Sequence, residues 1–283
     1  MAILSIQSQV SYGYVGNSVA QPALQALGHD VWAVPTVLFS NHPGYGAFQG
    51  DVRPSDDIRR VLKGVLALAA TDHCDAILSG YLGRSTTGVV VHDTVITLRR
   101  RCPELLYVCD PVIGDVSEGV YVDAGLVDIF RDCLLPMADV ITPNAFELSL
   151  LSDAPVTSIS AAVAAARHLI SNGPRYVIVT SVVDPDRPGK LTTLLVSADQ
   201  AVAISHARID QPPKGAGDLL TAIWLGRHLN GEAAGPALAA AVGSVFDLIG
   251  QAAYLADREL PVIRQRHLLL MPDSRLSLTP VSN

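Results

Sequence analysis

The stretch from Lys214 to Trp224 holds the residues with the clearest capacity for chemistry. It reads Lys-Gly-Ala-Gly-Asp-Leu-Leu-Thr-Ala-Ile-Trp, with apolar residues recurring at helical spacing after its glycines. Gly215 and Gly217, on either side of Ala216, let the backbone turn tightly and approach a ligand. The free N–H groups and the dipole of a helix's first turn favour an anion. The sequence therefore predicts an anion hole that opens a helix, and Gly226 is a candidate end for that helix.

Asp218 follows the glycines directly and lies in the first turn of this predicted helix. Its carboxylate would be within reach of a group that attacks a bound phosphate, and could orient and deprotonate an alcohol. A weak base suffices, because the hydroxyl loses its proton late in a loose phosphoryl-transfer transition state. The alternative is an ordinary glycine turn in which Asp218 only caps the helix. The motif alone does not decide between the two.

Length and composition predict one globular α/β domain spanning residues 1–283. Of the 283 residues, 49% are hydrophobic and 17% are charged, which suits a buried sheet covered by helices. The formal net charge of -7 argues against a nucleic-acid partner. A phosphate site needs only a local positive field, so the charge does not exclude ATP.

The start of the chain predicts a cytoplasmic protein. Ala2 to Ile6 is already strand-like, without a basic leader or a long apolar segment, so we expect no signal peptide. The longest weakly charged stretch, 233–246, is too short to span a bilayer, and we expect no membrane partner. The four cysteines show no metal-binding or redox spacing and are interpreted as reduced core residues.

Alternating strand and helix patterns indicate a central parallel sheet. Ala2 to Ile6 is a predicted strand, Gln7 to Gly16 the loop at its carboxyl end, and a helix follows. Ligands bind at this edge of an open parallel sheet. The glycine spacing matches neither the dinucleotide fingerprint nor a Walker motif. Further on, Thr192 to Val196 and Val202 to Ser205 alternate like an antiparallel edge.

A polar, aromatic and glycine-rich stretch from Thr36 to Gly50 suits a loop that lines a substrate site. It contains His42, but a loop histidine is more often a hydrogen-bonding or solvent-exposed residue than a catalytic one. Its aromatic side chains suit either stacking on a flat ring or packing.

Two acidic groups follow other predicted strands. The strand Leu105 to Cys109 delivers Asp110 to the carboxyl edge, with Asp115 five positions later, where carboxylates suit a metal or phosphate site. Asp110 before proline is also a common turn initiator. Asn144 and Glu147 share one face of a helix start, so they fit both a capping box and a cation or phosphate site.

Taken together, these residues resemble the ribokinase superfamily and, within it, the pyridoxal kinase family. The matching pieces occur in the right order over roughly residues 3 to 225. They are Ile6-Gln7-Ser8, Tyr12-Gly13-Tyr14-Val15-Gly16-Asn17-Ser18, Val37-Leu38-Phe39-Ser40-Asn41-His42, Ser79-Gly80-Tyr81-Leu82-Gly83, Cys109-Asp110-Pro111-Val112, Ile141-Thr142-Pro143-Asn144 with Glu147, and Gly215-Ala216-Gly217-Asp218.

The resemblance implies a ribokinase-like fold, a mostly parallel β-sheet flanked by helices on both faces, in a protein that is usually a homodimer. It implies phosphorylation of the 5'-hydroxymethyl group of pyridoxal, pyridoxine or pyridoxamine with ATP and Mg²⁺, and leaves open a monovalent cation such as K⁺. Asp218 is similar to the family's catalytic base, and Gly215, Ala216 and Gly217 to its anion hole.

The remaining site residues are assigned by the same resemblance. The implied substrate-binding residues, together with Asp218, are Ser8, Val37, Phe39, His42, Tyr81 and Tyr121. The implied nucleotide-binding residues are Asp110, Asp115, Thr142, Asn144, Glu147, Thr180, Ser181, Lys214, Gly215 and Gly217. Asp110 and Glu147 are the implied metal ligands, and residues 115–122 resemble the flap over the nucleotide.

The chain departs from the family pattern at two positions. Pro43-Gly44 replaces a threonine that contacts substrate, and the loss of one such hydrogen bond costs about 0.5 to 1.5 kcal/mol. Thr180 stands where many bacterial members carry a lysine that contacts ATP, a charge that Lys214 could supply instead. The alternatives are a kinase for hydroxymethylpyrimidine or another small alcohol, and a non-catalytic pyridoxal or nucleotide binder.

Overall fold

The computed structural model describes residues 1–123, 125–187 and 189–281, and its centre is a ten-stranded sheet. Along the sheet the strand order is β12-β11-β10-β9-β8-β5-β4-β1-β2-β3. These strands are β1 (Ala2–Val10), β2 (Asp30–Phe39), β3 (Gly50–Val52), β4 (Cys74–Ser79), β5 (Leu106–Cys109), β8 (Val140–Ile141), β9 (Tyr176–Val183), β10 (Lys190–Val196), β11 (Ala201–Ala207) and β12 (Thr279–Pro280). A separate hairpin pairs β6 (Gly114–Asp115) with β7 (Gly119–Val120).

Helices connect the strands and cover both faces of the sheet. They are α1 (Asn17–Ala26), α2 (Ser55–Leu66), α3 (Ser85–Arg99), α4 (Gly125–Ile129), α5 (Ala145–Ser152), α6 (Ile159–Ile170), α7 (Ala216–Leu229), α8 (Ala234–Leu255) and α9 (His267–Leu270). Shorter helical turns are η1 (Pro43–Tyr45), η2 (Ala69–His73), η3 (Phe130–Leu134) and η4 (Leu135–Met137).

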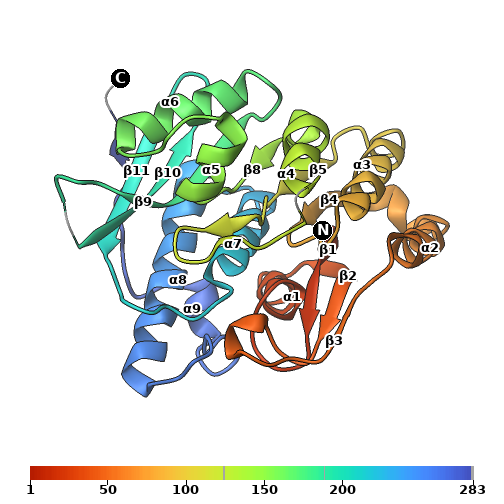
Figure 1. Ribbon diagram of the computed structural model, residues 1–283, viewed down its shortest axis with the longest axis horizontal. Coiled ribbons are helices and arrows are strands. Elements are labelled where there is room, and N and C mark those ends of the chain that lie inside the picture. The colour runs from red at the N-terminus through yellow and green to blue at the C-terminus, as the bar shows by residue number, and fades with distance from the viewer. Residues whose placement is uncertain (124, 188, 282–283) are drawn as a thin grey trace.

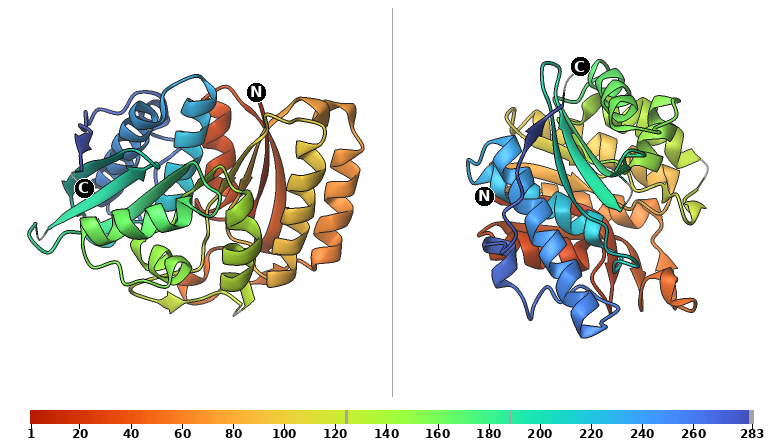
Figure 2. Two further views of the ribbon diagram at one scale, coloured as in Figure 1. Left: turned by 90° about the horizontal axis from the view of Figure 1, so that it is seen from above. Right: turned by 90° about the vertical axis from the view of Figure 1, so that its left-hand side faces the viewer.

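The helices form two layers, one on each side of the sheet (Figures 1 and 2). One buried cluster joins the sheet to α2, α3, α5 and α6, and a second joins it to α1, α7, α8 and α9. Six neighbouring strands pair in parallel, in the order β2, β1, β4, β5, β8 and β9, while β10, β11 and β12 pair antiparallel at one edge. The expected α/β class, two helical layers and antiparallel edge are confirmed. The sequence did not predict β3, which adds an antiparallel strand at the other edge.

The first strand is longer than its apolar run predicted. β1 continues to Val10, so Ser8 lies in the strand and not in the expected loop. Its register with β2 shifts between Gln7 and Gln9, so that Thr36 and Val37 together lie opposite Ser8. An irregularity of this kind bends a strand and redirects side chains. The polar residues Gln7 and Ser8 are buried by tertiary contacts, which the absence of an apolar pattern after Ile6 does not indicate.

Gly226 does not end the helix that begins at the glycine-rich loop, because α7 continues to Leu229. A Cβ at Gly226 would lie only 2.7 Å from Leu27 Cδ1. The carbonyl of Gly226 also lies 2.8 Å from His29 Nε2. Glycine is therefore used here for close approach between α7 and the end of α1, not for a helix stop.

The helix α8 is long and apolar enough to cross a membrane by length and composition alone. Its buried residues, including Leu238, Val242 and Leu248, instead belong to the cluster that joins α7 and the sheet. An apolar helix packed in this way is typical of the core of a large α/β protein.

Candidate active site

The glycine-rich loop is fixed by direct contact with the turn after β1. Gly215 has φ +88° and ψ 1°, a left-handed conformation that favours glycine. A Cβ at Gly215 would lie 1.8 Å from the carbonyl oxygen of Tyr14. A Cβ at Gly217 would meet no protein atom within 4 Å. Gly215 is thus required by the protein's own packing, whereas Gly217 leaves open space at the start of α7.

Asp218, in the first turn of α7, is held by the same turn after β1. The backbone N–H of Gly16 donates to Asp218 Oδ2 over 2.9 Å. Burial raises the pKa of Asp218 to about 6, against the opposing effect of the Gly16 hydrogen bond. A carboxyl group with this pKa is mostly ionised at neutral pH and still basic enough to accept a proton. Asp218 thus accepts from a residue outside α7, whereas a residue that only caps a helix accepts from N–H groups at the start of that helix.

One cavity of about 290 Å³ extends from α7 toward the antiparallel edge of the sheet. All ten residues assigned to the nucleotide line it: Asp110, Asp115, Thr142, Asn144, Glu147, Thr180, Ser181, Lys214, Gly215 and Gly217. Thr180 pairs with Asn144 through an isolated parallel bridge, and Ser181 has the rare positive φ of 58°. We refer to this space as the α7 cavity.

A second cavity of about 270 Å³ lies on the other side of Asp218, over β1 and β2. All the residues assigned to the substrate line it: Ser8, Val37, Phe39, His42, Tyr81, Tyr121 and Asp218. Val37 and Phe39 are buried and give it an apolar wall. Ser8 and His42 add polar groups, and burial lowers the pKa of His42, although Glu259 opposes this. We refer to this space as the β1–β2 cavity.

The two cavities meet at a common wall made by five residues: Val112, Tyr121, Lys214, Gly215 and Asp218. The arrangement brings together side chains from opposite ends of the sequence, and it places the carboxylate of Asp218 where groups bound in the two spaces would meet. Such a junction suits the transfer of a group between two ligands.

Asn144 and Glu147 form the capping box that their spacing predicted. Asn144 Oδ1 accepts from the N–H of Glu147 over 2.9 Å, and Glu147 Oε2 accepts from the N–H of Asn144 over 2.9 Å. Glu147 Oε1 also accepts from the N–H groups of Ile113 at 2.9 Å and Gly114 at 3.3 Å. The box therefore also anchors the hairpin β6–β7 onto α5.

Asp110 is buried beside two hydroxyl groups. Thr221 Oγ1 lies 3.4 Å from Asp110 Oδ2 and 3.0 Å from Thr142 Oγ1. Burial is the largest cause that raises the pKa of Asp110, followed by the negative charges of Asp218 and Glu147. Burial likewise raises the pKa of Glu147 to about 7, despite its three backbone hydrogen bonds. Three carboxyl groups thus share one poorly solvated region.

The hairpin carries Asp115, Glu118 and Tyr121 over this junction. Asp115 Oδ1 accepts from the N–H groups of Ser117 and Glu118, both at 2.8 Å, which fixes the turn. Lys214 Nζ lies 2.5 Å from Glu118 Oε1 and 3.4 Å from Asp115 Oδ2. Although burial lowers the pKa of Lys214, these two carboxylates raise it overall. Lys214 therefore connects the hairpin to the glycine-rich loop.

The charge around the junction is strongly unbalanced. Five carboxylates line the two cavities, and Lys214 is the one lysine or arginine among the lining residues that the structure describes. No set of three or more His, Cys, Asp and Glu residues in the described chain is arranged to hold a metal ion by itself. Magnesium commonly needs only one or two protein carboxylates together with phosphate oxygens and water. The unpaired negative charge fits such a cation.

Several residues in or beside the two cavities could not be recognised from the sequence. Thr221 lies within an apolar helix, and Glu118 within a short polar turn. The far end of the α7 cavity is lined by Leu191, Thr193, His206, Ile209, Val245, Phe246 and Ile249. They come from β10, from β11 and the segment after it, and from α8, and only the sheet order and the packing of α8 bring them together. The ring centroids of His206 and Phe246 lie 4.9 Å apart.

The chain is similar to several known kinases. The family model described as phosphomethylpyrimidine kinase matches residues 49–262. The pyridoxal kinase PdxY of Corynebacterium diphtheriae is 41% identical over 277 residues, covering 96% of each chain. The pyridoxal kinase PdxY of Granulibacter bethesdensis is 40% identical over 279 residues, covering 97% of this chain and 98% of its own.

A solved structure of pyridoxal kinase from Leishmania donovani in complex with ADP and pyridoxamine superposes with a TM-score of 0.93, at 30% identity and 99% coverage of both chains. The identities extend over nearly the full length of the chain. The chain belongs to the pyridoxal kinase family.

Proposed function

We propose that this protein transfers the γ-phosphoryl group of ATP to the 5'-hydroxyl of pyridoxal, with pyridoxine and pyridoxamine as further substrates. The observation that carries the proposal is the junction of the α7 and β1–β2 cavities at Asp218 and Gly215. A kinase must hold a phosphate donor and an alcohol on opposite sides of one reacting centre. Relatives named pyridoxal kinase, and a fold neighbour that binds ADP and pyridoxamine, support this choice of ligands.

The α7 cavity is the proposed site for ATP. The open N-terminus of α7 at Gly217 would receive phosphate oxygens through backbone N–H groups. The apolar and aromatic surface at the far end, including Val245, Phe246 and His206, suits a flat adenine ring. Asn144 and Thr180 also line this cavity, and we expect them to make polar contacts to the phosphates.

The β1–β2 cavity is the proposed site for the pyridine ring. Phe39, Val37 and Tyr81 would pack against the flat faces of the ring, while Ser8 and His42 offer polar contacts at its edge. Its volume of about 270 Å³ suits a single small ring with short substituents. Pro43 also lines this cavity, so the position where the family usually carries a hydroxyl faces the substrate here with an apolar ring.

Asp110 and Glu147 fit a role in holding Mg²⁺ with the ATP phosphates. Burial raises both pKa values, with a further contribution from the neighbouring negative charges, and a divalent cation would stabilise the ionised carboxylates. Both Glu147 oxygens already accept backbone hydrogen bonds, so we assign its contact with the cation to a bridging water. When bound, Mg²⁺ would neutralise charge that develops on the phosphate oxygens.

Different residues of the site have different roles in the proposed phosphoryl transfer. Asp218 orients the substrate hydroxyl and accepts its proton as the oxygen attacks phosphorus. The N–H groups of Gly215 to Gly217 stabilise negative charge on the transferred phosphoryl group. Lys214, already at the junction, adds a positive charge beside it, and the hairpin β6–β7 covers the reacting groups from water.

The same proposal includes the setting of the reaction. We propose a single catalytic domain over residues 1–283 that acts in the cytoplasm, where ATP is available. We further propose a homodimer, as is usual in the family, and a dependence on a monovalent cation such as K⁺, which activity assays with exchanged salts would test.

The direct test is an ADP-release assay with ATP and Mg²⁺, offering pyridoxal, pyridoxine, pyridoxamine, hydroxymethylpyrimidine and ribose in parallel. Turnover with the B6 vitamers is expected. Turnover restricted to hydroxymethylpyrimidine, a compound related to the name of the matching family model, would contradict the proposed substrate but not the fold. Tight pyridoxal binding without ATP consumption would instead support a non-catalytic binder.

A further inference from the structure

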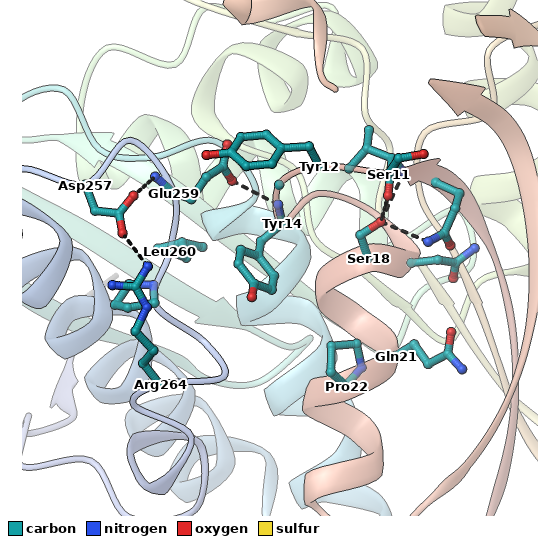
Figure 3. A pocket seen from close by; sticks show the side chains of 15 residues that line it. Ser11, Tyr12, Tyr14, Ser18, Gln21, Pro22, Asp257, Glu259, Leu260 and Arg264 are labelled. Carbon is teal, nitrogen blue, oxygen red and sulfur yellow. Dashed lines mark hydrogen bonds and ion pairs between the residues drawn. The ribbon is translucent and has the colours of Figure 1, made fainter. Parts of the chain in front are cut away.

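Glu259 is a buried carboxylate outside both cavities that the proposed chemistry does not use. It lies four residues after the end of α8, and only 6% of its surface is exposed. Figure 3 shows it beside Tyr12 and Tyr14, in the wall of a third cavity of about 510 Å³ between α1 and the segment after α8. Burying a carboxylate is costly unless its oxygens are well satisfied, so its contacts indicate what it does.

One oxygen of Glu259 holds the turn after β1. The backbone N–H of Tyr14 donates to Glu259 Oε2 over 2.9 Å (Figure 3). Gly13 is the residue that permits this approach, because a Cβ there would lie 2.9 Å from both carboxylate oxygens. On its other side the same turn supports the reacting centre, through the Tyr14 carbonyl against Gly215 and the Gly16 N–H to Asp218.

The other oxygen holds the loop that carries His42. The Tyr45 hydroxyl donates to Glu259 Oε1 over 2.7 Å, and His42 Nε2 lies 3.7 Å from the same atom. The ring of Tyr45 lies between neighbours on two sides, with Arg258 4.2 Å above its centroid and the Tyr12 ring edge-on at 5.8 Å. His42, Pro43 and Gly44 of this loop line the β1–β2 cavity.

We propose that Glu259 is a positioning residue that sets the distance between the substrate loop, at His42 and Tyr45, and the turn that seats Gly215 and Asp218. Glu259 lines neither the α7 cavity nor the β1–β2 cavity. Through Tyr14 and Tyr45 it fixes the turn after β1 and the His42 loop relative to each other. The inference rests on the proposed function for its kinetic consequence. The geometric part, that Glu259 holds the loop, stands independently of the substrate.

The consequence is selective for the alcohol substrate. Loosening the loop at His42 enlarges or disorders the β1–β2 cavity, whereas the far end of the α7 cavity is formed by β10, β11 and α8 and does not contact Glu259. Glu259→Gln keeps the shape but weakens the two hydrogen bonds, and Tyr45→Phe removes only the loop contact. A matched control is Asp247→Asn, which removes a partly buried carboxylate of α8 that accepts from the N–H of Ser274 over 2.9 Å.

Steady-state kinetics of the four proteins separate positioning from stability. We expect Glu259→Gln and Tyr45→Phe to raise KM for pyridoxal roughly tenfold, with KM for ATP and kcat changed by less than about twofold. Asp247→Asn should leave both KM values unchanged. A fall in kcat alone, with KM for pyridoxal unchanged, would show a merely structural role, as would an equal rise in KM for ATP.

Hydrogen exchange of the ligand-free proteins tests the geometry without any substrate. The amides of Tyr45 and Gly46 are protected by bonds to the carbonyls of His42 and Pro43, at 3.2 and 2.8 Å. Exchange of peptides covering residues 41–49 should accelerate in Glu259→Gln and Tyr45→Phe but not in Asp247→Asn. Unchanged exchange there overturns the inference even if the kinase is active. A wild-type protein inactive on pyridoxal would overturn the proposed function, and the exchange data would still decide the role of Glu259.

Discussion

The backbone amide of Gly16 and the carboxylate of Asp218 are joined by a 2.9 Å hydrogen bond, although 202 positions separate them in the sequence. One carboxylate oxygen of Asp218 is thereby fixed from the β1 side of the sheet. Because Asp218 also lines both cavities, its other oxygen is available to a ligand at their junction. This arrangement explains how a residue on α7 can act on an alcohol bound over β1 and β2.

The pH dependence of kcat/KM should report Asp218. Its pKa is raised from 3.8 to about 6, so it is ionised above that pH and the base is lost as pH falls through 6. We expect kcat/KM for pyridoxal to level off above about pH 7 and to fall toward tenfold per pH unit below pH 6. His42→Gln is the control that should keep this limb. An acid limb near pH 4 would contradict the assignment.

Two glycine substitutions should have opposite effects on folding. Gly215→Ala places a Cβ against the Tyr14 carbonyl in a left-handed conformation, so we expect the free energy of unfolding to fall by at least about 1 to 3 kcal/mol. Gly217→Ala meets no protein atom and should fold normally, with up to about 1 kcal/mol of added helix stability. If phosphate binds there, kcat falls. Urea unfolding and the ADP assay test both, and full activity of Gly217→Ala would count against the anion hole.

Magnesium should stabilise the protein more at high pH than at low pH. The pKa of Glu147 is raised from 4.5 to about 7, so its contribution to stability is present below pH 4.5 and is lost as pH rises through 7. Added Mg²⁺ offsets that loss at high pH, whereas at low pH it must first displace protons. We therefore expect Mg²⁺ to raise Tm more at pH 8 than at pH 5.5.

The control for this effect is a pair of matched carboxylate variants. Asp110→Asn should largely remove the Tm increase, and Asp247→Asn, which lines neither cavity and binds Ser274, should retain it. An equal Tm increase at both pH values, or one that survives Asp110→Asn, would place the cation elsewhere.

Lys214 offers a test of where its positive charge acts. Its ion pair with Glu118 is nearly half exposed at both ends, so Lys214→Met should change the free energy of unfolding by no more than about 1 kcal/mol. If the ammonium also serves ATP, KM for ATP rises in Lys214→Met, while Glu118→Gln, which removes the shorter of its two ion pairs, does not raise it. Equal increases in the two variants would indicate that the ion pair itself matters.

The sequence predicted the parts of the site that form local patterns. Gly215 to Asp218 form a loop and helix start within four residues, and Asn144 with Glu147 form a capping box within four, so their geometry follows from short-range rules. The apolar alternation also predicted the antiparallel edge at β10 and β11. Family resemblance then assigned Ser8, Tyr81 and Tyr121, and the structure brings all of them to one cavity.

Contacts between distant segments account for what the sequence did not predict. Gly226 has the signature of a helix end but serves the packing of α7 on α1. The polar end of β1 is a strand because β2 pairs with it across an irregular register. Glu259 looks like an ordinary surface acid in a charged segment, and only the tertiary fold places it under Tyr14 and Tyr45.

The central claim is that Asp218 is the base of a pyridoxal kinase, and single-site substitution tests it most directly. ADP release with pyridoxal should be compared for the wild type, Asp218→Ala and Asp218→Asn, with pyridoxal binding measured by calorimetry on the same samples. We expect kcat to fall by about 10² to 10⁴ in both variants while pyridoxal still binds. Turnover by Asp218→Asn at the wild-type rate would contradict the account.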